Sequence, residues 1–447
     1  MIARPPAGAP RPYRFPGLVR HELPSGLGVW LVPLPDRELV SVHLLTDAGA
    51  AAEEEPQAGV AALTAQLLVT GTQTLDAAAF AEATERLGIE VGSESSWDSA
   101  RAAFVALGSH LDAGLELLAD MVTAPRLDAG EFDRLKAERL NDILQARAEP
   151  GRLADERFLG EVFADGVPYG RLSAGRPETV EPLSVESVRG YHASRYAPGV
   201  ADIVIAGGFD VDDGLAAVER HLGGWTGEAP GHRTIEPRQR AGRRVVVVDR
   251  PGSVQSELRV GHLGIDRHHE RYFPAMVMAA LLGGVFGSRL NLRLREELGY
   301  TYGARCSFDP RRAVGPFTAN AAVQTEVTTD AIRELLAQLE RIREAPPEED
   351  ELAEVRDFLV GVFPLRFEST SGIAAAIEPL AVYDLPDDYW HTYRSRLEAV
   401  TPDDVQAVAR ELIRPDEALI LVVGDASKVA DELRSAELGP VEVVAGS

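Results

Sequence analysis

The chain has 447 residues, which is more than one hydrophobic core usually holds and which predicts two or more domains. Its formal net charge of −25 argues against nucleic acid and against an anionic membrane surface as partners, because both are bound through clustered lysines and arginines. Hydrophobic residues make up 45% of the chain, yet no segment approaches the roughly 18 consecutive apolar residues of a transmembrane helix. The composition is that of an ordinary globular protein.

The N-terminal stretch 1–17 contains arginine and proline but lacks the apolar run of a secretory signal. Cys306 is the only cysteine, so no disulfide can form within the chain, and its apolar neighbours predict a small core residue. We therefore expect a cytoplasmic location, with a periplasmic one as the alternative if a leader has been removed.

Strand and helix patterns then follow one another in the same order twice. Strands are predicted at 28–33 and 39–45, and again at 244–249 and 257–262. Helical segments come next at 59–69 and 78–87, matched by 273–283 and 288–298, and strand pairs follow at 90–107 and 301–323. Longer amphipathic helices are predicted at 110–121, 129–148 and 155–164, matched by 328–343, 348–361 and 370–382, before a last helix and strand in each half.

An internal repeat supports this division into two halves. Leu298-Gly299 repeats Leu87-Gly88, and Ser307-Phe308 repeats Ser96-Trp97, both at a distance of 211 positions. Strands followed by grouped helices favour an α+β fold over a doubly wound sheet. We therefore expect an N-terminal lobe at 17–221, a linker rich in glycine and proline at 222–242, and a homologous C-terminal lobe at 243–440.

Three segments of the first half, 47–55, 59–72 and 81–88, resemble the pitrilysin/insulinase family of metallopeptidases, to which the mitochondrial processing peptidases belong. The resemblance extends from about residue 17 to 440. It implies two homologous lobes, each a mostly antiparallel β-sheet packed against grouped helices, which face one another across a chamber.

Active members of that family carry the motif H-x-x-E-H in the first lobe. Two imidazoles one helical turn apart hold a zinc ion there, the glutamate polarises the bound water, and a distal glutamate completes the coordination. The matching positions in this chain are Ala62, Ala65 and Gln66, and the distal position is Asp142. Alanine has no donor atom and glutamine is a poor zinc ligand, so the resemblance implies a degenerate zinc site and no cofactor in this chain.

The ten histidines of the chain do not form another zinc site of this kind, because no two of them lie in H-x-x-x-H register. A Ser-His-Asp triad stays open as an alternative, since triads assemble from distant positions, but the chain has no G-x-S-x-G motif.

The stretch 288–302 in the second half resembles the family's substrate-binding segment, in which an arginine and a tyrosine seven positions later reach the peptide backbone. The matching residues are Arg293 and Tyr300, and the pair Arg295 and Tyr302 repeats that spacing as the alternative register. An arginine fork can donate to peptide carbonyls and a phenol can stabilise an oxyanion. The glycine run at 283–287 either lines the chamber or is a plain junction between a helix and a loop.

In two-subunit members of the family, one chain carries H-x-x-E-H and its companion supplies the arginine and tyrosine. The resemblance therefore implies a non-catalytic subunit of a heterodimeric zinc metallopeptidase, which binds peptide or unfolded protein together with a homologous zinc-bearing partner. Two alternatives remain. The chain is an inert structural or peptide-binding protein of the same fold, like the core proteins of respiratory complexes, or it is an enzyme whose chemistry these motifs do not reveal.

Overall fold

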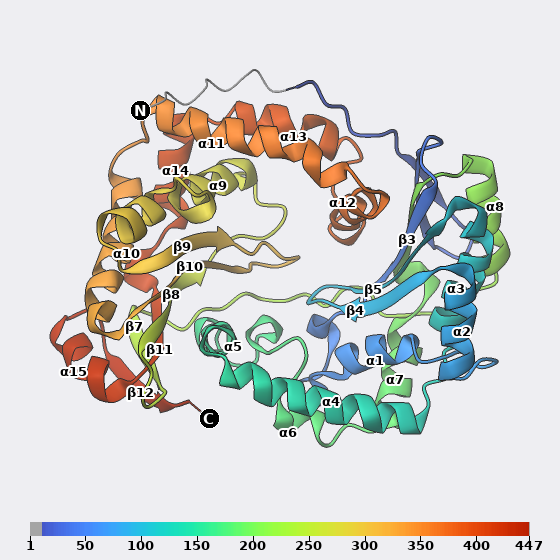
Figure 1. The fold of residues 1–447 in the computed structure, drawn as a ribbon, viewed down its shortest axis with the longest axis horizontal. Helices are drawn as coiled ribbons and strands as arrows, with labels where there is room; N and C mark the ends of the chain where they lie inside the picture. Colours follow the sequence, from blue (N-terminus) through green and yellow to red (C-terminus); the bar gives the residue numbers. More distant parts are fainter. Residues whose placement is uncertain (1–10, 447) are drawn as a thin grey trace.

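The computed structural model describes residues 11–446 and contains one six-stranded sheet in each half of the chain (Figure 1). The first ten residues, which belong to the N-terminal stretch discussed above, lie outside the described range. The strands of the first sheet, in spatial order, are β1 (Val19–Glu22), β2 (Gly28–Pro33), β6 (Ala201–Gly207), β3 (Leu39–Thr46), β5 (Ala100–Leu107) and β4 (Glu90–Ser95). Those of the second are β12 (Val441–Ala445), β7 (Arg244–Asp249), β11 (Leu419–Gly424), β8 (Gln255–Leu263), β10 (Pro316–Gln324) and β9 (Thr301–Phe308).

The two sheets share one topology, which confirms the α+β prediction and the two-lobed arrangement. In both, a parallel pair (β2 with β6, β7 with β11) is followed by three antiparallel neighbours. They differ in the outer strand, because β1 lies antiparallel to β2 whereas the C-terminal β12 lies parallel to β7. Strands β4 and β9 form the opposite, unpaired edges of the two sheets.

Helices group between the strands as the amphipathic pattern predicts. The first half contains α1 (Val60–Leu68), α2 (Ala77–Leu87), α3 (Leu111–Thr123), α4 (Ala129–Ala148), α5 (Pro150–Val162), α6 (Pro177–Val180), α7 (Val185–Arg195) and α8 (Val211–Leu222). The second contains α9 (Tyr272–Ala279), α10 (Thr328–Glu344), α11 (Glu349–Val362), α12 (Thr370–Val382), α13 (Tyr389–Glu398), α14 (Pro402–Leu412) and α15 (Ala426–Ser435). Ser184 and Thr401 begin α7 and α14 with reciprocal capping hydrogen bonds.

Two predicted helices of the second half differ from a regular α-helix. Residues 280–284, which continue α9, and residues 291–297 are wound more widely, as π-helix. Such distortions are frequent at functional sites.

One face of each sheet is covered by helices of its own half, and the other face by a helix from the other half. Helix α12 packs on β3 and β6 of the N-terminal lobe, and α5 packs on β8 and β11 of the C-terminal lobe (Figure 1). Along β6, Ile203 and Ile205 point into the core of their own lobe, whereas Val204 and Ala206 contact the cluster around α12. The two lobes therefore share their hydrophobic cores.

Helices α12 and α5 each pack on the sheet of the other lobe and are called the crossing helices below. Polar contacts lie beneath both of them. Glu378 of α12 accepts from the imidazole of His43 at 2.5 Å and from Arg101 at 2.9 Å. Asp155 of α5 accepts from the buried guanidinium of Arg259 at 2.6 Å. Each crossing helix is thus fixed to the opposite sheet by apolar packing and by at least one ion pair.

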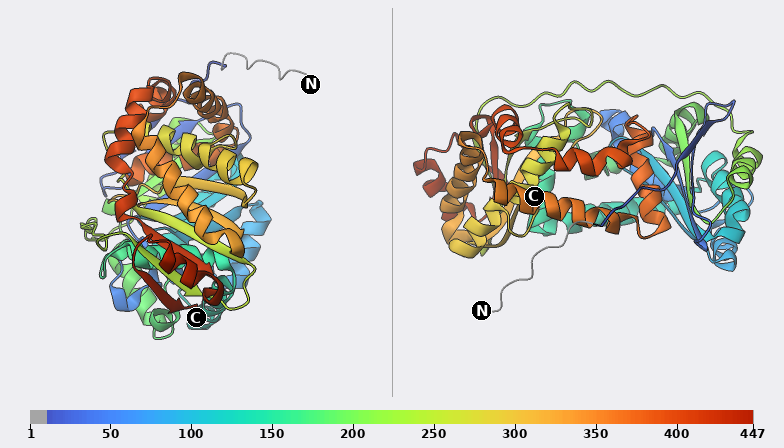
Figure 2. Two further views of the ribbon diagram at one scale, coloured as in Figure 1. Left: turned by 90° about the vertical axis from the view of Figure 1, so that its left-hand side faces the viewer. Right: turned by 90° about the horizontal axis from the view of Figure 1, so that it is seen from above.

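The connection between α8 and β7 runs as an extended segment along one side of the molecule (Figure 2). Gln239 attaches this segment to the second lobe. Its side chain accepts from the amide of Leu263 at 2.8 Å and donates to the carbonyl of Glu417 at 2.7 Å. Within residues 11–446, no helix combines the length and the apolar character needed to cross a bilayer.

Candidate functional site

Helix α1 carries the positions of the degenerate motif, and a buried carboxylate fixes its start. Gly59 precedes the helix with a φ of +103°, and a Cβ there would lie 2.9 Å from Val180. Oε1 of Glu53 accepts from the amides of Gly59 at 3.1 Å and Ala61 at 2.7 Å. Burial raises the pKa of Glu53 to about 8, against the opposing effect of these hydrogen bonds and of Arg171.

Ala62 and Gln66 lie one turn apart on a partly exposed face of α1, whereas Ala65 is fully buried. The side-chain oxygen of Gln66 is buried without a hydrogen-bond partner. The helix thus keeps the spacing of a metal-binding motif but presents one amide and no imidazole.

Asp142 lies on α4, which packs against α1, and its side chain is exposed. Burial lowers the pKa of the neighbouring Arg139, and the charge of Asp142 opposes that shift. One alanine, one amide and one exposed carboxylate do not fit zinc, which needs three or four nitrogen, sulfur or carboxylate ligands. In the part of the chain that the structure describes, no group of three or more His, Cys, Asp or Glu side chains could hold a metal ion.

The segment 288–302 of the C-terminal lobe is anchored by Asn291. Its amide nitrogen donates to Ser288 Oγ and to the carbonyl of Val285, both at 3.2 Å, and its oxygen accepts from the amide of Ala304 at 2.9 Å. Because Ala304 belongs to β9, one buried side chain ties the wide helical segment to the edge strand of the sheet.

Arg293 is fully engaged within its own lobe. Its guanidinium forms two hydrogen bonds with Glu334 of α10, at 2.8 and 3.0 Å, and a third with Glu297 at 2.7 Å. Tyr300 is partly buried and packs against the core of the C-terminal lobe. The predicted pair is therefore held by internal contacts.

Tyr302 is more exposed than Tyr300, and the guanidinium of Arg295 makes fewer contacts within the lobe than that of Arg293. The guanidinium of Arg295 lies 4.6 Å above the ring of Phe286, whose side chain is 71% exposed. Tyr302 is 93% exposed at the start of β9, the strand that packs beside the segment carrying Arg295. A partly exposed cation, an exposed phenol and a second aromatic ring can together contact an extended peptide.

The glycine run before this segment has a mixed role. Gly283 is buried against β9, because a Cβ there would lie 2.4 Å from the amide nitrogen of Cys306. Gly287 has no neighbour within 4 Å of its Cβ position, and Phe286 between them points to solvent. Cys306 is buried, as its apolar surroundings predict.

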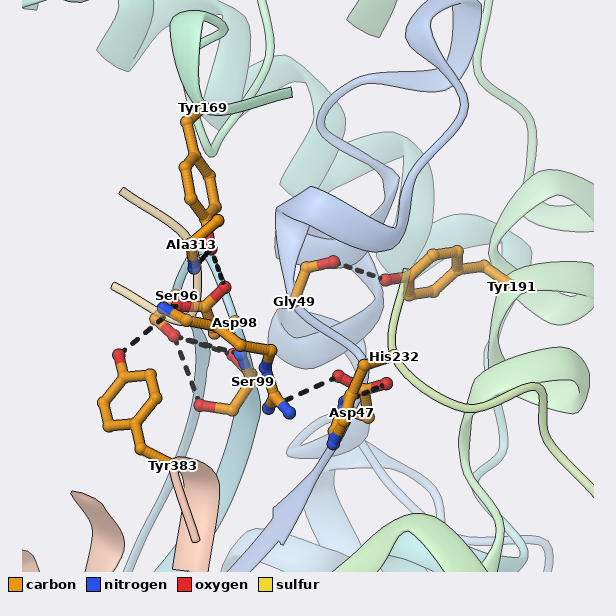
Figure 3. Close-up of polar contacts among 11 residues, drawn as sticks. Asp47, Gly49, Ser96, Asp98, Ser99, Tyr169, Tyr191, His232, Ala313 and Tyr383 are labelled. Carbon is orange, nitrogen blue, oxygen red and sulfur yellow. Dashed lines mark hydrogen bonds and ion pairs between the residues drawn. The ribbon is translucent and has the colours of Figure 1, made fainter. Parts of the chain in front are cut away.

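A second polar cluster lies at the junction of the lobes, and no motif in the sequence indicated it (Figure 3). Asp47, at the end of β3, forms ion pairs with His232 of the connecting segment at 2.7 Å and with Arg312 at 3.8 Å. These residues line a cavity of about 250 Å³ together with Trp97 and Tyr169. In the sequence, only the internal repeat points to this region. It aligns Trp97-Asp98 with Phe308-Asp309, at the tips of equivalent hairpins.

The repeated sheets, the helices that pack across the lobes and a helix α1 without imidazole side chains define a two-lobed protein of metallopeptidase type with a degenerate metal position. The insulinase family model (peptidase family M16) matches residues 29–167, and the model of the peptidase M16 inactive domain matches residues 182–359. The chain belongs to the insulinase family of peptidases, M16.

Relatives of this chain include proteins described as proteases and as non-peptidases. An uncharacterized zinc protease of Mycobacterium bovis is 28% identical over 88% of this chain and 90% of its own length. The non-peptidase homolog YmxG of Helicobacter pylori is 25% identical over 74% of this chain and 76% of its own.

Solved structures match nearly the whole molecule. A peptidase M16 inactive domain from Pseudomonas fluorescens has a TM-score of 0.85 and 25% identity, over 91% of this chain and 98% of its own. A chain of complex III₂ from Candida albicans has a TM-score of 0.78 and 15% identity, over 94% of this chain and 99% of its own, which shows a shared fold.

Proposed function

We propose that this chain is the non-catalytic subunit of a heterodimeric zinc metallopeptidase. A homologous partner that carries H-x-x-E-H supplies the zinc, and this chain contributes peptide-binding groups from its C-terminal lobe. The observation that carries the proposal is the combination of a motif helix without imidazoles, at Ala62 and Gln66, with a partly exposed arginine and an exposed tyrosine in the second lobe. The match of residues 182–359 to an inactive peptidase domain supports it.

Arg295 and Tyr302 suit the binding role better than Arg293 and Tyr300. Arg293 would have to break its double hydrogen bond with Glu334 before it could bind a peptide, whereas Arg295 has only a 3.4 Å contact with Glu296 and the face of Phe286. We assign Arg295 to donate to peptide carbonyl oxygens, and the exposed hydroxyl of Tyr302 to donate to the peptide at the partner's site.

The second candidate function is an inert structural or peptide-binding protein. The fold shared with the complex III₂ chain and the similarity to a non-peptidase homolog favour it. The partly exposed Arg295 and the exposed Tyr302 favour the peptidase subunit, because a purely structural protein has no need for a solvent-facing phenol in this segment.

Substitutions in the mixed complex test this assignment. With the zinc-bearing partner present, Arg295→Ala or Tyr302→Phe should lower kcat/KM for peptide cleavage by about 10- to 100-fold, because each removes a donor to the peptide. Arg293→Ala and Tyr300→Phe are the matched controls and should change it by no more than about three-fold. If the controls lose activity and the first two variants do not, the predicted pair Arg293 and Tyr300 binds the substrate. If none of the four loses activity, the second candidate function gains support.

A further inference from the structure

The edge hairpins of the two lobes meet tip to tip at one buried carboxylate (Figure 3). Asp98 lies in the turn between β4 and β5 and is 5% exposed. Its Oδ1 accepts from the hydroxyl of Tyr169 at 2.5 Å. Its Oδ2 accepts from the backbone amide of Arg312 at 3.0 Å and from the hydroxyl of Tyr383 at 3.3 Å.

Two of the three donors follow the helices that pack across the lobes, and the third lies in a hairpin turn of the C-terminal lobe. Tyr169 follows α5, a helix of the first half that packs on the sheet of the second half. Tyr383 directly follows α12, a helix of the second half that packs on the sheet of the first half. Arg312 lies in the turn between β9 and β10. Asp98 therefore binds the end of α12, the 3-10 turn at Pro168–Gly170 that follows α5, and the tip of the opposite hairpin at the same time.

Aromatic rings and a buried guanidinium lie beside these hydrogen bonds. The rings of Trp97 and Tyr169 lie edge to face at 6.0 Å, and the buried guanidinium of Arg311 stacks on both at 4.4 and 4.9 Å. Charge-assisted hydrogen bonds are stronger in such a site than in water.

The two tyrosine hydroxyls remain donors at neutral pH. Burial, together with the charge of Asp98, raises the pKa of Tyr169 and of Tyr383. Tyr169 also accepts from the amide of Ala313 at 3.3 Å, so the hairpin tip is held at two successive amides. Because Asp98 already accepts from three donors, it is not a free general base.

We propose that Asp98 is a positioning residue that holds the β9–β10 hairpin in a fixed placement on the N-terminal lobe, and through β9 the peptide-binding Tyr302. The inference rests on the proposed function for the role of Tyr302. Strand β9 is an edge strand that pairs with β10 and packs on residues 280–284 and 291–297, so the tip of its hairpin projects beyond the core of its own lobe. Asn291 holds the end near Tyr302 and Asp98 holds the other.

Hydrogen exchange of the full chain without a partner tests the structural half of the proposal. Asp98→Ala should speed amide exchange across residues 301–315 by about ten-fold, since the hairpin tip loses its acceptor and its fixed position. Asp98→Asn should give a smaller increase, because its carbonyl can still accept from the amide of Arg312. Asp431→Asn removes one negative charge from a side chain that is 98% exposed and should leave this exchange unchanged.

Steady-state kinetics of the complex with the zinc-bearing partner test the positioning half. The KM for peptide should rise in the order wild type, Asp98→Asn, Asp98→Ala, in step with the exchange rates, and Asp431→Asn should match the wild type. Faster exchange confined to Arg312, or a KM that is the same in all four proteins, would overturn the proposal. If the wild-type chain activates no partner, the proposed function fails on its own, since the exchange comparison uses the chain alone.

Discussion

Glu53 is the residue whose protonation bears most directly on helix α1. Its carboxyl group accepts from two amides at the start of the helix and is almost completely buried. Burial raises its pKa from the ordinary value of 4.5 to about 8, so the folded protein keeps a proton that the unfolded chain loses. The stability that this group contributes is therefore fully present below about pH 4.5 and decreases as the pH rises to 8.

The substitution Glu53→Gln should remove this pH dependence. The amide oxygen can still accept from Gly59 and Ala61, and the variant has no charge to bury. Relative to the wild type, its free energy of unfolding should increase by between about 3 and 5 kcal/mol as the pH rises from 4.5 to 8. Urea denaturation across this pH range measures the difference, and parallel pH profiles for the two proteins would contradict the account.

At the scale of single residues, the sequence shows which residue types occur at which spacings. It does not show which side chains contact one another. Two arginine–tyrosine pairs share the spacing of seven, and the sequence cannot choose between them. Our proposal of Arg295 and Tyr302 depends on Glu334, which lies 41 positions from Arg293 and binds its guanidinium. The role of Asp98 was likewise invisible, because its donors lie 71, 214 and 285 positions away.

At the scale of elements, the exchange of α5 and α12 joins the stability of each lobe to the other half of the chain. Ile377 of α12 is fully buried in a cluster with Trp30 and Val204 of the N-terminal sheet. The apolar pattern of residues 370–382 predicted the helix with its observed bounds. It could not predict the sheet that the helix covers, because periodicity defines an apolar face and not its partner. The widely wound segments at 280–284 and 291–297 were missed for a similar reason, since their sequence is compatible with a regular helix.

The substitution Ile377→Ala should therefore destabilise the opposite lobe. It should lower the free energy of unfolding by about 2–5 kcal/mol and speed amide exchange in β3 and β6, because the cavity opens beneath those strands. Leu365→Ala, at a side chain that is 62% exposed, is the matched control and should have little effect. Loss of protection confined to the second half of the chain would contradict a shared core.

At the scale of the whole molecule, two repeated lobes face one another, tied by two crossing helices and by the Asp98 junction (Figure 2). The internal repeat was sufficient to predict two lobes of the same topology, because equivalent turn and cap residues recur at nearly constant offsets. The contacts between the lobes were not predictable, since they join residues that no local pattern relates. The shared cores couple the stability of each lobe to that of the other.

Peptide cleavage by the purified chain, alone and mixed with a homologous partner that carries H-x-x-E-H, tests the central claim most directly. We predict no cleavage by the chain alone and a chelator-sensitive increase when the partner is added. Cleavage by this chain alone that a chelator abolishes would contradict the account, because helix α1 offers no imidazole to a metal ion.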